Sequence, residues 1–272
     1  MAKLNWLYRQ INLLSLDIAT GVVICTLFFA RIFQAHTRPQ GMIVLWLTVW
    51  IIYTADHLLD AYRIKGKAAT ERHRFHQQHF FVLIMLLGLG LLINGILVFF
   101  LKAEVFHWGV WLIVVVFGYL VFQKHLRFFK EFIAATLYSG GVLLPPLALS
   151  PLPLDFFKAM LLLQFFLIAW SNLILFSWFD EENDIRDKHN SFVTTMGRTR
   201  TGIFLALVFA VSVALCVFQF SYHTPWLMPI VILMVMNGVL IFIFLNRSWF
   251  TPYDRFRLWG DAVFLFPIVF LI

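Results

Sequence analysis

Long apolar runs constrain the fold of this chain more than any other feature of its sequence. A helix needs about 20 mostly apolar residues to cross the hydrocarbon core of a bilayer. Only 13% of the residues are charged and 61% are apolar, which leaves too little polar surface to cover a soluble core. The sequence therefore predicts an all-α polytopic membrane protein, a single domain over residues 1–272 with nine transmembrane helices. The nine predicted spans are 11–33, 41–60, 79–101, 106–123, 131–150, 156–179, 201–221, 225–245 and 256–272.

The basic residues predict the orientation of these spans. If nine helices alternate across the membrane, 17 of the 21 Lys and Arg residues fall on the side of the N-terminus. Because Lys and Arg concentrate in cytoplasmic loops, the N-terminus is predicted to be cytoplasmic and the C-terminus to lie across the membrane. Topology thus accounts for most of the net charge of +7, and no nucleic-acid partner is expected. The expected location is a bacterial inner (cytoplasmic) membrane, with membrane lipid around the helices.

The acidic residues gather at two points of the chain. Asp56 and Asp60 form a DxxxD pattern at the end of the second predicted span, and Asp180 and Asp184 form another at the end of the sixth. The i,i+4 spacing places both carboxylates of a pair on one helix face, where they repel each other and oppose the helix dipole. A bound cation relieves both problems. Carboxylates as the only protein ligands suit Mg²⁺, which keeps waters and bridges to substrate phosphates.

Basic residues follow the acidic pairs in the predicted cytoplasmic loops. Their side chains could contact the oxygens of a diphosphate, and they could equally serve as anchors of membrane orientation. Asp17 and Asp261 lie inside the first and ninth predicted spans, where an ionisable residue usually has a function. The candidate diphosphate ligands are Arg63, Arg72, Arg74, Lys124 and Arg127.

Two DxxxD patterns, at the ends of the second and sixth of nine spans, make the chain similar to the UbiA superfamily of intramembrane prenyltransferases. Residues 52–60 resemble the family's first motif, NDxxDxxxD, although Ile52 and Tyr53 replace its opening Asn-Asp. Residues 70–74 and 191–197 resemble stretches that follow the two motifs in the family. The resemblance implies a UbiA-like bundle. It also implies that the residues that bind Mg²⁺ and carry catalysis are Asp56, Asp60, Asp180 and Asp184.

The activity implied by the resemblance is Mg²⁺-dependent transfer of a polyprenyl group from a polyprenyl diphosphate to a lipophilic acceptor, aromatic or otherwise, at the cytoplasmic side. Loss of the Asn-Asp keeps a second interpretation open, a non-catalytic protein or a transport or lipid-handling protein with a degenerate acidic site. Against transport, the acids lie at one membrane face, whereas transporter sites usually lie near the midplane.

Overall fold

The computed structural model describes residues 2–64, 66–68, 70–187, 190–222 and 227–272, and side chains from residue 7 onward except those of residues 124 and 127. Every regular element in the described ranges is helical, which confirms the predicted all-α architecture. The long helices are α2 (Leu16–Ile32), α3 (Pro39–Arg63), α5 (Phe80–Leu97), α6 (Ala103–Phe122), α7 (Lys130–Leu149), α8 (Phe156–Phe179), α11 (Arg198–Ser221) and α12 (Leu227–Leu245). The short ones are α1 (Ala2–Leu13), α4 (Glu71–Gln78), α9 (Glu181–Arg186), α10 (Phe192–Met196), α13 (Arg247–Phe250), α14 (Arg255–Ala262) and α15 (Ile268–Leu271). The 3-10 turns are η1 (Val98–Phe100), η2 (Gln123–His125), η3 (Arg127–Phe129), η4 (Pro252–Asp254) and η5 (Val263–Leu265).

The length and hydropathy of these helices are those of an integral membrane protein. Within the described residues, seven helices are long and apolar enough to cross a bilayer. Residues 7–13 of α1 and the whole of α2 together form an eighth candidate, bent by 79°. Only 11% of the most apolar stretch of α5 with η1, and 6% of that of α6, is buried inside the protein. Such exposed apolar faces require lipid around them.

The last predicted span differs from the expectation of a continuous helix. Over residues 256–272 the chain forms α14, η5 and α15, with Pro267 before α15. Proline has no backbone N–H, so the helical hydrogen bond from residue 267 to the Val263 carbonyl is missing here. The start of the predicted eighth span, residues 225 and 226, lies outside the described residues. The count of nine spans and the cytoplasmic N-terminus remain predictions.

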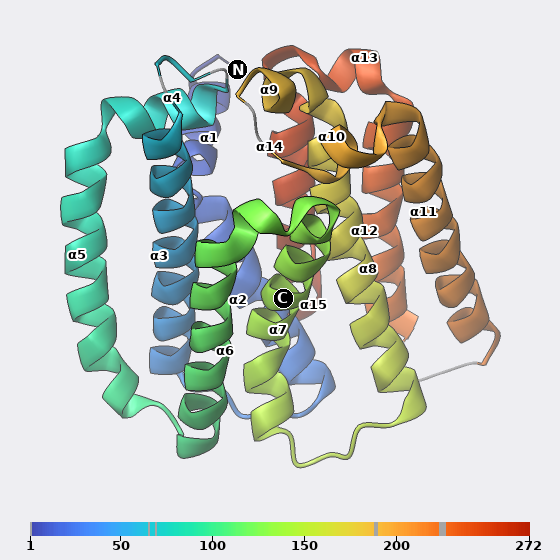
Figure 1. Ribbon diagram of the computed structural model, residues 1–272. Helices are drawn as coiled ribbons and strands as arrows, with labels where there is room; N and C mark the ends of the chain where they lie inside the picture. The colour runs from blue at the N-terminus through green and yellow to red at the C-terminus, as the bar shows by residue number, and fades with distance from the viewer. Residues whose placement is uncertain (1, 65, 69, 188–189, 223–226) are drawn as a thin grey trace.

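Helix α8 packs against α7, α11 and α12 and is the most deeply buried of the candidate spans, with 67% of its apolar stretch inside the protein. Around it the aromatic rings of Phe28, Phe29 and Phe165 form edge-to-face contacts that join α2 to α8. Figure 1 shows α4, α9 and α10 together at one end of the bundle, where α3 and α8 also end. Both acidic motifs are therefore carried to the same end of the molecule.

Helix α7 continues through two internal prolines, Pro145 and Pro146. A proline removes the N–H that would bond to the carbonyl four residues earlier, so the Val142 carbonyl loses its helical donor to Pro146. The Thr26 hydroxyl of α2 donates to this carbonyl at 3.0 Å. The two helices are therefore held together at the point where α7 is weakest.

Candidate prenyl diphosphate site

A cavity of about 410 Å³ lies inside the bundle, with walls from α2, α3, α6, α7, α8 and α14. All four predicted acids line it, so the structure brings together two motifs that are far apart in the sequence: Asp56, Asp60, Asp180 and Asp184. Away from the acids the wall is mostly apolar, with side chains such as Leu112, Leu137 and Leu173. The cavity thus has an acidic end and an apolar remainder.

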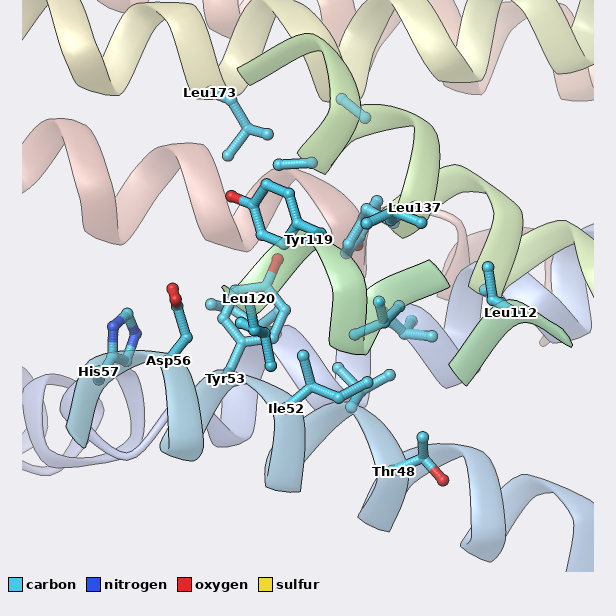
Figure 2. Close-up of a pocket in the computed structure, with 18 of the residues that line it drawn as sticks. Thr48, Ile52, Tyr53, Asp56, His57, Leu112, Tyr119, Leu120, Leu137 and Leu173 are labelled. Carbon is cyan, nitrogen blue, oxygen red and sulfur yellow. The ribbon is translucent and has the colours of Figure 1, made fainter. Parts of the chain in front are cut away.

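The first acidic pair lies in the last turns of α3, on one helix face as predicted. The Asp56 carboxylate accepts a hydrogen bond from Nε2 of Gln123 at 2.9 Å, and Asp60 is buried with Arg63 Nη1 3.6 Å from its Oδ1. Figure 2 shows Asp56 and Tyr53 pointing from α3 into the cavity, with Tyr119 of α6 opposite. The tyrosine that replaces the acid of the family's motif therefore places a ring on the cavity wall.

The second acidic pair spans the junction between α8 and α9. Asp180 follows the last residue of α8, and its carbonyl accepts a hydrogen bond from the Asp184 N–H at 2.8 Å, so one helical turn still separates the two acids. Asn183 Nδ2 donates to Oδ1 of Asp180 at 3.0 Å. Burial raises the pKa of Asp184 to about 6, and the Asp180 charge adds to that rise, while a hydrogen bond from Ser191 opposes it. Such a carboxylate is stabilised by a nearby cation.

The donor set of the cavity fits Mg²⁺ bound together with a diphosphate. Among the described residues, no group of three or more His, Cys, Asp or Glu side chains is arranged to hold one metal ion. Mg²⁺ does not require such a group, because it is usually bound through one or two carboxylates, waters and substrate phosphates. Two carboxylate pairs on one cavity wall match that mode.

The predicted basic ligands have different positions. Arg72 is buried on the cavity wall. Arg63 pairs with Asp60 and Arg74 donates to the Ala68 carbonyl at 3.1 Å, and neither of these two arginines lines the cavity. The side chains of Lys124 and Arg127 lie outside the described residues. Of the three candidates whose side chains the structure describes, Arg72 lines the cavity and the other two do not.

A buried polar network holds Arg72 in place and gives Asp17 and Asp261 a structural role. The Asn12 amide donates to Oδ2 of Asp17 at 2.6 Å and to Oδ2 of Asp261 at 2.8 Å. Arg72 Nη2 donates to Oδ1 of Asn12 at 2.9 Å and lies 3.5 Å from Asp261. Four elements, α1, α2, α4 and α14, thus meet at the acidic end of the cavity.

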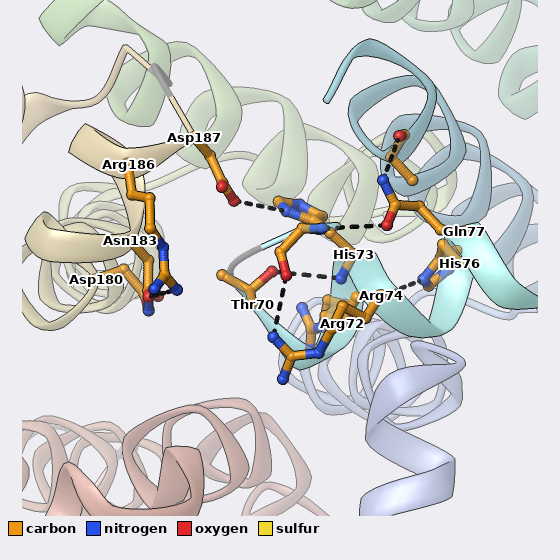
Figure 3. Close-up of polar contacts among 12 residues, drawn as sticks. Thr70, Arg72, His73, Arg74, His76, Gln77, Asp180, Asn183, Arg186 and Asp187 are labelled. Carbon is orange, nitrogen blue, oxygen red and sulfur yellow. Dashed lines mark hydrogen bonds and ion pairs between the residues drawn. The ribbon is translucent and has the colours of Figure 1, made fainter. Parts of the chain in front are cut away.

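Helix α4 also contacts the segment that follows the second motif. Nδ1 of His73 lies 4.0 Å from Oδ2 of Asp187, and Figure 3 shows the Asp187 side chain reaching toward α4. The segments that follow the two motifs therefore meet above the cavity.

The sequence did not reveal three further charged residues of the cavity wall: Lys130, Glu131 and Arg257. In the sequence, Lys130 and Arg257 indicate the orientation of the spans. The sequence did contain one indication for Arg257. It precedes Asp261, an ionisable residue inside a predicted span, by four positions, so the two residues share a helix face. Glu131 begins a predicted span, a position that has no motif around it.

Solved structures match the chain over almost its entire length. A UbiA homolog from Aeropyrum pernix K1, in its apo form, superposes with a TM-score of 0.68 at 13% identity, covering 97% of this chain and 98% of that one. The chain has the UbiA fold. The predicted resemblance is therefore confirmed at the level of the fold.

Two further structures with the UbiA fold come from Archaeoglobus fulgidus. This UbiA homolog, bound to DMAPP and Mg²⁺, matches with a TM-score of 0.62 at 12% identity, covering 95% of this chain and 97% of that one. Bound to GPP and Mg²⁺, it matches with a TM-score of 0.63 at 12% identity, over 95% of this chain and 98% of that one. No family model matches the sequence, and no curated protein does so either.

Proposed function

We propose that the protein is a Mg²⁺-dependent prenyltransferase of the UbiA superfamily, which transfers a polyprenyl group from a polyprenyl diphosphate to a lipophilic acceptor. One observation carries the proposal. Two DxxxD pairs from distant parts of the sequence line one cavity that is acidic at one end and apolar elsewhere. That division matches the division of a prenyl diphosphate into a charged head and an apolar chain. The neighbouring structures bound to DMAPP or GPP with Mg²⁺ support the class of donor.

The acidic end of the cavity would hold the diphosphate. Mg²⁺ would be bound by Asp56, Asp60, Asp180 and Asp184, and it would supply positive charge that stabilises the departing pyrophosphate. Arg72 presents a guanidinium on the same wall, a group that pairs with phosphate through two parallel hydrogen bonds. Arg63, Arg74, Lys124 and Arg127 remain proposed ligands from the flanking segments.

The apolar part of the cavity would hold the prenyl chain and exclude water from the allylic carbon as its bond to oxygen breaks. The rings of Tyr53, Tyr119 and Phe264 line the wall, and aromatic faces stabilise positive charge nearby. The acceptor would attack this carbon from within the cavity. We place the reaction at the cytoplasmic side of a bacterial inner membrane, following the distribution of basic residues.

Release of pyrophosphate tests the proposal directly. Purified full-length protein would be given radiolabelled farnesyl or geranylgeranyl diphosphate and a membrane extract as the source of acceptor, with and without Mg²⁺. We expect metal-dependent release that is lost in Asp56→Asn and Asp180→Asn. Glu104→Gln is the matched control, because Glu104 is exposed in the first turn of α6 and does not line the cavity.

Two results would contradict the proposal. Release that is unchanged in Asp56→Asn and Asp180→Asn would remove the acids from the site. Absence of release and of donor binding at every chain length would favour the non-catalytic or lipid-handling interpretation.

A further inference from the structure

Arg257 of α14 contacts the second acidic motif directly. Its guanidinium forms an ion pair with Oδ2 of Asp180, and both residues line the cavity. The guanidinium carbon lies 5.2 Å from the centre of the Phe176 ring and 5.5 Å from that of Phe256. The aromatic rings keep the cation beside the acid, since they attract it electrostatically.

The backbone of α14 is fixed against α8, so the position of Arg257 is not adjustable by moving the helix. A Cβ atom added to Gly260 would lie 2.5 Å from Cε1 of Phe176 and 2.6 Å from Oδ1 of Asn172. One residue further, Asp261 is bonded to Asn12 in the buried network that holds Arg72. A change in the ion-pair partner of Arg257 must therefore come from rotation of its side chain and not from movement of α14.

The Asp180 carboxylate cannot pair closely with the Arg257 guanidinium and with a divalent cation at the same time. Two cations on one carboxylate oxygen repel each other strongly in a poorly solvated site. A diphosphate removes the conflict, because its oxygens offer the guanidinium a new bidentate partner.

We propose that Arg257 is a diphosphate-binding residue that neutralises Asp180 in the empty site and exchanges this partner for the diphosphate when the substrate binds. The inference rests on the proposed function and adds α14 as a third element of the diphosphate site, beside the two DxxxD motifs. It assigns two opposite effects to one side chain. Arg257 opposes the binding of metal alone and favours the binding of diphosphate.

The experiment compares wild-type protein with Arg257→Gln and Arg257→Lys, full length and in lipid nanodiscs. Arg198→Gln is the matched control, because Arg198 also pairs with an acid next to Asp180, Nη1 lying 3.4 Å from Oε2 of Glu181, and does not line the cavity. Binding of Mn²⁺ alone is measured by electron paramagnetic resonance. Binding of geranyl diphosphate in the presence of Mg²⁺ is measured by calorimetry.

We expect Arg257→Gln to bind Mn²⁺ more tightly than wild type and to bind geranyl diphosphate roughly tenfold or more weakly, the usual effect of losing a charge-assisted hydrogen bond. Arg257→Lys keeps the charge but loses the two parallel N–H donors of the guanidinium. Its diphosphate affinity should therefore lie between those of wild type and Arg257→Gln. Arg198→Gln should match wild type in both measurements. A purely structural role would weaken both affinities of Arg257→Gln together.

Thermal unfolding keeps the test decisive if removal of the ion pair destabilises the protein. Arg257→Gln leaves Asp180 without its cation, so its Tm without metal should fall and Mg²⁺ should raise that Tm more than it raises the wild-type value. Equal Mg²⁺ shifts, or Mn²⁺ affinity no higher than wild type, would overturn the inference. Wild-type protein that binds no prenyl diphosphate of any chain length would instead contradict the proposed function, and with it the diphosphate half of this inference.

Discussion

Glu131 shows how a single buried carboxylate can join the cavity wall to the segment after the second motif. Its Oε1 accepts a hydrogen bond from the Phe192 backbone N–H at 2.7 Å, while its Oε2 has no hydrogen-bond partner. Glu131→Ala would leave the buried N–H unpaired, which costs about 1–3 kcal/mol of unfolding free energy. Glu131→Gln keeps an acceptor oxygen, so it should be much closer to wild type in thermal unfolding. Equal Tm values for the two variants would contradict this role for the carboxylate.

Among single residues, the four acids of the cavity were predictable from the sequence because the same i,i+4 spacing occurs twice. Asp56, Asp60, Asp180 and Asp184 could be predicted to share a site because each pair has a helical spacing and ends a predicted span. For Arg257 the spacing from Asp261 was the single signal, and it did not indicate Asp180 as the partner, while the charge of Arg257 served equally well as an indicator of orientation. Only the folded chain shows that its guanidinium reaches Asp180.

Among the elements, α14 depends on a glycine at its contact with α8. Gly260→Ala would place a methyl group 2.5 Å from Cε1 of Phe176, and such overpacking typically costs about 1–3 kcal/mol. We expect a lower Tm and weaker binding of geranyl diphosphate, because α14 carries Arg257. The control is Gly238→Ala in α12, where an added Cβ meets no atom within 4 Å. Two glycine variants with the same Tm and affinity would contradict a fixed α14.

Helix α8 depends on a cap at its start. The Asp155 side chain accepts the Lys158 N–H at 2.8 Å, and its Oδ2 lies 2.9 Å from the buried Nζ of Lys158. Asp155→Ala removes both contacts, so the loss should exceed the roughly 1 kcal/mol typical of an N-cap. Asp155→Asn keeps the cap and loses the charge, and its Tm should lie between those of wild type and Asp155→Ala. A Tm of Asp155→Asn as low as that of Asp155→Ala would assign the whole effect to the charge.

The Asp155 contact also has a pH dependence of defined sign. Burial is the largest single effect and opposes ionisation, but the Lys158 contacts together outweigh it and hold the pKa of Asp155 below its usual value. A lowered pKa in the folded state contributes stability above the unfolded pKa of about 3.9, and this contribution is lost as pH falls through the lower folded value. The Tm difference between wild type and Asp155→Asn should therefore shrink below about pH 4. A constant difference down to the lowest pH that the protein tolerates would contradict the assignment.

The element that the sequence predicted least well is the last span. Its apolar residues continue to the end of the chain, so a hydropathy pattern cannot show the break at η5. The break is compensated by α2, where the Cys25 thiol lies 3.3 Å from the Phe264 carbonyl and Gly21 leaves room for the Phe264 side chain. Such compensation depends on contacts between the first and last parts of the chain, which local patterns do not contain.

At the scale of the whole molecule, the fold was predictable because apolar runs set the helices and two acidic motifs had to share one membrane face. The sequence did not predict the bend between α1 and α2 or the depth of the cavity, because both depend on packing between helices that are distant in the sequence. The same packing leaves the outer faces of α5 and α6 bare of protein, and lipid has to cover them. Topology, cavity and lipid contact are thus consistent with one another.

Orientation in the membrane is the remaining prediction for the whole molecule. The acidic end of the cavity lies at the end of the bundle that carries most of the basic residues, so a cytoplasmic N-terminus also places the site in the cytoplasm, where a water-soluble diphosphate head is accessible. Labelling with an impermeant thiol reagent tests this, because both native cysteines are buried and one cysteine can be added at a time. Exposed Glu182 lies in α9, and exposed Leu154 lies two residues before α8 begins. Figure 1 shows α9 and the start of α8 at opposite ends of the bundle.

On intact cells, we expect Leu154→Cys to be labelled from outside and Glu182→Cys to be labelled only after the membrane is permeabilised. Unaltered protein is the control and should stay unlabelled in both conditions, since Cys25 and Cys216 are covered. The reverse pattern would place the acidic motifs on the outer face. The diphosphate donor would then have to cross the membrane before it could reach Asp56 and Asp180, so the sidedness of the proposed reaction stands or falls with this measurement.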